Sequence, residues 1–154
     1  MKWVKQSIHY WCPDTKEHKF LGQNITVAIL DTGISPHPDF KGRILSFRDF
    51  SSTTGSSEKV LFSFSHFSPL IDNSGHGTHV AGILAGSGLL SSGTYAGIAP
   101  FCNLIIGKVL DQNGNGSIKN VIDGIQWIRD IYTQFHIRII NISVGTRPDL
   151  SIHQ

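Results

Sequence analysis

The sequence has few of the features that define several common protein classes. Only two of its 154 residues are cysteines, Cys12 and Cys102, which is too few for a disulfide framework, and we predict that both are reduced thiols. No segment approaches the roughly 20 apolar residues of a membrane-spanning helix, and residues 1–20 lack the continuous apolar stretch of a signal peptide. These absences predict a cytoplasmic protein with no membrane partner.

Charge is also scarce. Charged residues make up 16% of the chain and the formal net charge is +2, so no concentrated basic surface is indicated. A nucleic-acid partner is therefore not expected.

Hydrophobic residues and glycines are plentiful by comparison. The hydrophobic fraction of 40% suffices for one core, and the 16 glycines stand beside short apolar runs. Nearly unbroken apolar runs are typical of strands buried on both faces of a parallel sheet. They predict strands at 25–30, 104–110 and 138–143, and a further short strand at 43–50.

Helical periodicity appears in two places. Val80, Ile83 and Leu84 share one face of a helix predicted over 76–86, with small Gly77, Ala81 and Gly82 allowing close packing. A second helix follows the N-cap candidate Ser117, and its apolar positions are Ile118, Val121, Ile122, Ile125 and Ile128. The alternation of strands and helices predicts an α/β fold with an open parallel sheet and helices on both faces.

Two segments stand outside this alternation. Residues 1–23 are mixed and polar, and we predict an irregular N-terminal surface segment there, followed by one domain over 24–154. Residues 51–70 are rich in serine and indicate a surface insertion, with a hairpin as one possibility.

Two short motifs carry chemistry. Asp31 follows the buried run VAIL and precedes Thr-Gly, which places a carboxylate at the carboxyl end of a strand. Alone, such an aspartate is better explained as the cap of a loop or of a helix start. The second motif, GHGTHVAG, holds His76 and His79 three residues apart, whereas zinc-binding helical pairs are four apart with a glutamate between them. We therefore favour His76 as the reactive histidine and expect His79 to be buried and hydrogen-bonded.

Together these motifs resemble the subtilisin-like serine peptidases, the subtilases of peptidase family S8. The Asp-Thr-Gly and His-Gly-Thr-His-Val-Ala-Gly motifs occur in that family's order, and the resemblance covers about residues 25–145. It implies a serine endopeptidase in which Asp31 orients His76 and stabilises its imidazolium. His76 would then act as the general base toward a serine and as the acid toward the leaving amine.

The resemblance also implies a channel for an extended polypeptide substrate. Its glycine-rich edge corresponds to Gly114, Asn115 and Gly116, where missing side chains allow a peptide backbone to approach closely. The opposite wall corresponds to Ser143, Val144 and Gly145. Without the motifs, an ordinary turn and a strand end explain these residues equally well.

The sequence departs from the family in its nucleophile. No serine is preceded by Gly-Thr, so the family's Gly-Thr-Ser-Met-Ala motif is absent from the 154 residues. We expect a truncated, N-terminal part of the catalytic domain that is inactive by itself. The alternative is a catalytically inactive peptide-binding module or a decayed subtilase.

Calcium is the one cofactor that the resemblance raises. Many subtilases bind it through an aspartate corresponding to Asp39 and through the loop after the histidine helix. Here that loop, SGLLSSGTY, lacks the asparagine usual at such a site. We assign no metal and no cofactor.

Overall fold

The computed structural model describes residues 2–8, 10, 20–51, 60–61 and 72–145. Its centre is a five-stranded sheet in the order β3-β2-β4-β1-β5. The strands are β1 (Thr26–Asp31), β2 (Ile44–Asp49), β3 (Val60–Leu61), β4 (Asn103–Lys108) and β5 (Ile137–Ile142). All neighbouring pairs are parallel except β2 and β3, which are antiparallel. The predicted α/β fold with its parallel sheet is confirmed, and each of the four predicted strands lies within two residues of its predicted bounds.

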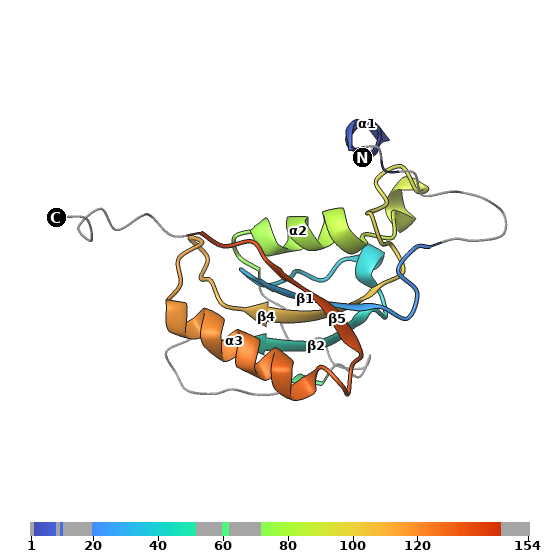
Figure 1. Cartoon of the computed structure of the whole chain (residues 1–154). Coiled ribbons are helices and arrows are strands. Elements are labelled where there is room, and N and C mark those ends of the chain that lie inside the picture. The colour runs from blue at the N-terminus through green and yellow to red at the C-terminus, as the bar shows by residue number, and fades with distance from the viewer. Residues whose placement is uncertain (1, 9, 11–19, 52–59, 62–71, 146–154) are drawn as a thin grey trace.

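Two helices cover opposite faces of this sheet (Figure 1). Helix α2 (His76–Ala85) lies on one face and α3 (Ile118–Ile131) on the other. The alternation of side chains along β1 serves both layers, because Val27 and Ile29 belong to the core under α2 while Ala28 and Leu30 belong to the core under α3. Short 3-10 turns at Pro38–Phe40 and Leu89–Ser91 complete the elements on the α2 side.

The buried face of α2 differs from the prediction in part, since Val80 and Leu84 are partly buried and pack against the core as expected. The fully buried positions are Gly77, Ala81 and Ala85, while Ile83 is 42% exposed. The small residues face the sheet because the helix lies very close to the loop after β1: a Cβ on Gly77 would come within 2.3 Å of the Gly33 carbonyl oxygen. Gly82, which we expected in this contact, has open space beside it instead.

Helix α3 also turns a different side inward. Of its five predicted apolar contacts, Ile128 is buried and Val121 is partly buried against the same core. The other three, Ile118, Ile122 and Ile125, are exposed. Gly124 allows the helix to approach Leu30. Trp127, which the helical pattern did not include, belongs to the same core and packs against Phe50 with ring centroids 5.7 Å apart.

The predicted cap of α3 is confirmed, since the Ser117 side chain accepts a hydrogen bond of 3.1 Å from the Asn120 amide. We expect Ser117→Ala to lower the free energy of unfolding by about 1 kcal/mol, measured by urea denaturation. Ser117→Asp keeps an acceptor at the cap and should retain the parent stability. Equal losses in both variants would contradict the capping role.

The N-terminal segment is not wholly irregular, which corrects the prediction for residues 1–23. Residues Lys2–Ser7 form the short helix α1. The segment is held by tertiary contacts, because Lys5 Nζ donates to the Gly97 carbonyl at 2.8 Å and the Tyr10 hydroxyl donates to the Ile98 carbonyl at 2.5 Å. A helix this short needs such contacts. Cys12 and most of the 51–70 insertion lie outside the described residues.

Candidate active site

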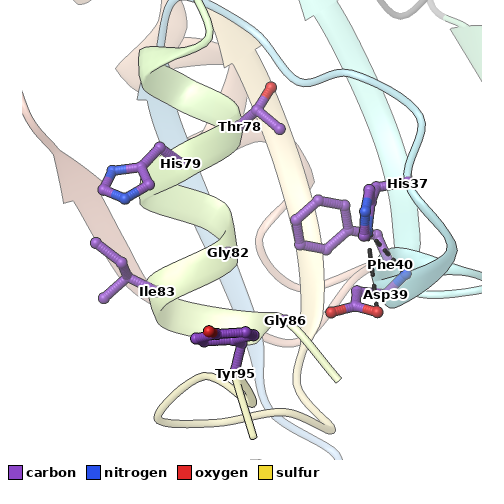
Figure 2. Close-up of a pocket in the computed structure, with 9 residues that line it drawn as sticks. All are labelled: His37, Asp39, Phe40, Thr78, His79, Gly82, Ile83, Gly86 and Tyr95. Carbon is purple, nitrogen blue, oxygen red and sulfur yellow. Dashed lines mark hydrogen bonds and ion pairs between the residues drawn. The ribbon is translucent and has the colours of Figure 1, made fainter. Parts of the chain in front are cut away.

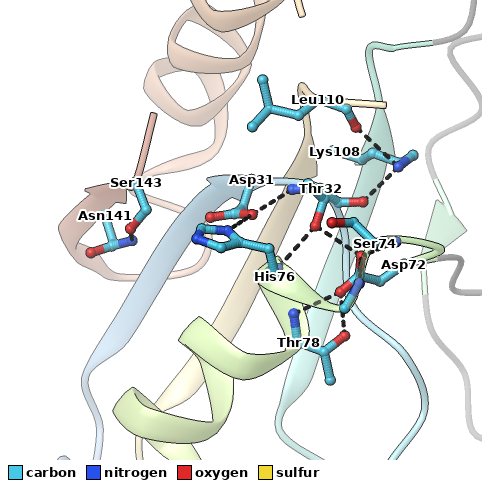
Figure 3. A network of polar contacts seen from close by, with 12 residues as sticks. Asp31, Thr32, Asp72, Ser74, His76, Thr78, Lys108, Leu110, Asn141 and Ser143 are labelled. Atoms are coloured by element: carbon cyan, nitrogen blue, oxygen red, sulfur yellow. Dashed lines mark hydrogen bonds and ion pairs between the residues drawn. The ribbon is translucent and has the colours of Figure 1, made fainter. Parts of the chain in front are cut away.

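The two motif residues meet at the carboxyl edge of the sheet. Asp31 is the last residue of β1 and His76 is the first residue of α2. His76 Nδ1 lies 2.7 Å from Asp31 Oδ1, across a sequence separation of 45 residues (Figure 3). Asp31 is fully buried, whereas the His76 side chain is 52% exposed.

The contact fixes the state of the imidazole. A carboxylate only accepts hydrogen bonds, so the proton of this contact lies on Nδ1 and leaves the lone pair on Nε2 in the neutral ring. The hydrogen bond to Asp31 and then its negative charge raise the pKa of His76 above the ordinary value of 6.5. The pair is thus arranged so that His76 accepts a proton at Nε2 while Asp31 stabilises the cation.

Asp31 is held in place by its neighbours. Its Oδ1 also accepts the Thr32 amide at 2.7 Å. Its Oδ2 is buried and has no hydrogen-bond partner among the described residues. The buried amine of Lys108 lies nearby and donates to the Thr32 and Leu110 carbonyls at 2.6 and 3.0 Å.

Sequence reasoning missed Asp72, which lies four residues before His76 and is 8% exposed. Its two carboxylate oxygens accept hydrogen bonds from Thr32, Ser74, Gly75 and Thr78. The available signal was an aspartate just before a predicted helix, where such residues satisfy free amide groups.

The two predicted substrate-binding segments follow the two strands that flank β1. Gly114–Gly116 comes after β4 and Ser143–Gly145 comes after β5, and all six residues are exposed. Gly114 has a φ of +77°, and a Cβ on Gly116 would come within 2.5 Å of the Val109 carbonyl oxygen, so both turns depend on glycine. The side-chain amide of Asn141 donates a hydrogen bond of 2.8 Å to the Ser143 hydroxyl (Figure 3).

His79 was predicted to be buried, and that prediction is wrong. It is exposed, and its imidazole has no hydrogen bond to any part of the chain that the structure describes. It lines an open cavity of about 400 Å³ over Gly82, between Ile83 and Tyr95 on one side and Phe40 on the other (Figure 2). The cause is the inward face of small residues in α2, which turns His79 toward solvent.

Asp39, the residue that the family resemblance relates to calcium, accepts backbone amides from the loop after α2. Its Oδ2 accepts the Gly88 amide at 3.0 Å and its Oδ1 accepts the Leu90 amide at 3.3 Å. The loop after α2 therefore presents N–H donors to this carboxylate, whereas calcium requires oxygen ligands. Within the described ranges, no group of three or more His, Cys, Asp or Glu residues is arranged to hold a metal ion.

Comparisons with known proteins identify the family. The model of the subtilase family matches residues 22–153. Serine protease AprX of Bacillus subtilis is 46% identical over 69% of this chain and 21% of its own length. The major intracellular serine protease of the same organism is 37% identical over 84% of this chain and 36% of its own length.

Solved structures show the same likeness. The CspB protease of Clostridium perfringens has a TM-score of 0.74 and 26% identity, over 90% of this chain and 32% of its own. Sphericase has a TM-score of 0.69 and 29% identity, over 90% of this chain and 43% of its own. The chain belongs to the subtilase family, and it spans a fifth to two fifths of the length of these relatives.

Proposed function

We propose that this chain supplies the acid–base half of a serine endopeptidase site. Asp31 orients His76, and His76 Nε2 takes the proton from a serine hydroxyl as that oxygen attacks a peptide carbonyl. The same nitrogen then protonates the leaving amine. The observation that carries the proposal is the 2.7 Å contact between a fully buried carboxylate and an exposed imidazole.

The substrate is an extended polypeptide that lies between the two segments flanking β1. Gly114, Asn115 and Gly116 pair with its backbone on one side, and Ser143, Val144 and Gly145 form the wall on the other. The chemistry is proton transfer and acyl transfer, so the proposal includes no metal and no cofactor.

The location of the protein stays a prediction. No helix in the described part of the chain combines the length and hydropathy of a bilayer-crossing segment. Named relatives include a major intracellular protease and a minor extracellular one. A cytoplasmic location remains our proposal.

The family's nucleophile motif does not occur in the 154 residues. We therefore expect the purified chain to hydrolyse fluorescent casein no faster than buffer. A chimera tests the Asp31–His76 pair itself. In this chimera, the matching segment of this chain replaces its counterpart in the serine protease AprX. We expect the chimera to hydrolyse casein and to be blocked by a serine-directed phosphonate.

Two outcomes would contradict the proposal. A folded chimera without turnover would favour the alternative, an inactive peptide-binding module. Phosphonate-sensitive turnover by the 154-residue chain alone would show that one of its own serines acts as the nucleophile. Asp130→Asn, which alters an exposed carboxylate on α3, is the matched control and should leave the turnover of the chimera unchanged.

A further inference from the structure

We propose that Asp72 is a positioning residue that holds His76 against Asp31 by tying the first turn of α2 to the loop after β1. This inference rests on the proposed function of the Asp31–His76 pair and deepens it. The Asp72 carboxylate is hydrogen-bonded to Thr32, Ser74, Gly75 and Thr78 rather than to Asp31 or His76, so its effect passes through the residues that it binds.

Asp72 binds both of the segments that must meet. From the loop after β1, the Thr32 hydroxyl donates to its Oδ1 at 2.8 Å. From the start of α2, the Gly75 amide donates to Oδ1 at 2.8 Å, and the Thr78 amide and hydroxyl donate to Oδ2 at 2.8 and 2.5 Å. The Ser74 amide adds a longer contact of 3.2 Å to Oδ1. One carboxylate therefore joins two elements that are distant in sequence.

Thr32 makes this connection act on the catalytic pair. It directly follows Asp31, and its hydroxyl oxygen accepts the amide of Gly77, which directly follows His76, at 2.9 Å. The same hydroxyl gives its proton to Asp72, so its orientation is fixed by the carboxylate. Thr32, which follows Asp31, and Gly77, which follows His76, are thus joined through the Thr32 hydroxyl oxygen. Asp72 orients that hydroxyl group (Figure 3).

Thr78 forms a second bridge of the same kind. Its hydroxyl donates to Asp72 and accepts the Ser35 amide at 2.9 Å. The loop after β1 is therefore held to α2 at two points, and Asp72 orients the hydroxyl at both. Two bridges restrict rotation of the helix start as well as its distance from β1, which is what the orientation of an imidazole requires.

The surroundings keep Asp72 charged. Burial raises the pKa of its carboxyl, but the hydrogen bonds from Thr78, Thr32 and Gly75 outweigh burial and hold that pKa below its usual range. The other charged or titratable groups of this network are Asp31 and His76 themselves and Lys108, whose amine binds the Thr32 carbonyl. The anion of Asp72 also contributes to raising the pKa of His76.

A residue that only caps the helix would affect stability alone, whereas a positioning residue would also affect the His76 imidazole. The chain offers a matched control for this difference. Asp39 is also a partly buried aspartate that accepts two backbone amides beside α2, but at the other end of the helix. We therefore compare Asp72→Asn with Asp39→Asn. Thr32→Val removes the bridging hydroxyl while leaving the charge of Asp72 in place, and it stands in for Asp72→Asn if that variant does not fold.

The first readout is proton NMR of the 154-residue chain, which needs no activity. We expect Asp72→Asn and Thr32→Val to remove the exchange protection of the His76 Nδ1–H proton, and Asp72→Asn to lower the pKa of His76. Asp39→Asn should change neither the exchange protection nor the pKa of His76, even if it destabilises the chain as much as Asp72→Asn does. Unchanged protection in both Asp72→Asn and Thr32→Val, or an equal loss in Asp39→Asn, would overturn the proposal.

The second readout is turnover of the AprX chimera. We expect Asp72→Asn to lower kcat about 10²-fold with little change in KM, because substrate contacts remain while the imidazole is misplaced. Unchanged kcat in a folded variant would overturn the positioning role. If the parent chimera is inactive while the NMR effects are as expected, the proposed function fails and the positioning of His76 by Asp72 stands.

Discussion

Asp31→Asn is expected to lower kcat of the AprX chimera about 10⁴-fold. An amide in place of the carboxylate presents an N–H as well as a carbonyl to His76 Nδ1, so the ring is no longer held with its lone pair on Nε2. The positive charge that His76 gains during the reaction also loses its buried counter-charge. KM should change little, because Asp31 is fully buried and does not face the substrate.

The same variant has a readout in the 154-residue chain. Because the pKa of His76 is raised in the folded state, its contribution to stability is complete below the ordinary pKa of 6.5 and is lost as the pH rises through the folded-state pKa. Asp31→Asn should lower that pKa and remove this pH dependence from urea denaturation curves. A variant with the parent's His76 titration would show that the 2.7 Å contact does not control the imidazole.

Gly77→Ala is expected to lower the free energy of unfolding by about 3 kcal/mol. The added methyl group would lie 2.3 Å from the Gly33 carbonyl oxygen and 3.2 Å from the Asp31 side chain. Backbone cannot move aside as the end of a side chain can, so α2 must shift away from the loop after β1. That shift also separates His76 from Asp31, and the pKa of His76 should fall.

Gly82→Ala is the matched control in the same helix. A Cβ at Gly82 has no atom within 4 Å, so the substitution gains helix propensity and should raise stability by about 1 kcal/mol. Urea denaturation of both variants measures the contrast. Similar changes in the two variants would show that the close approach at Gly77 does not constrain α2.

The sequence predicted best the features that depend on neighbouring residues. The buried strands appear as short apolar runs, and Ser117 as a cap before a helical pattern, because both signals are local. The positions of Asp31 at a strand end and of His76 at a helix start follow from the same signals. Their partnership, however, was inferred from a family resemblance, since no local pattern relates two residues 45 positions apart.

The errors concern which side of a helix faces the core. Hydrophobic periodicity placed Val80, Ile83 and Leu84 inward, but Ile83 is exposed and the other two are only partly buried against the core. The close approach of α2 to the sheet leaves the fully buried positions to Gly77, Ala81 and Ala85. His79 is exposed for the same reason. Asp72 was missed because its proposed role depends on hydrogen bonds from the loop after β1, which is distant from it in the sequence.

The amino-acid sequence by itself determined the class of fold and the order of its four parallel strands and two long helices. Through the family resemblance, it also indicated the two residues that meet at the site. The tertiary structure alone decided which helix faces are buried, that β4 and β5 flank β1, and that Asp72 joins the loop after β1 to α2. The physical reason is that apolar runs and caps act over a few residues. Close packing and buried hydrogen bonds, in contrast, depend on atoms that only the folded chain brings together.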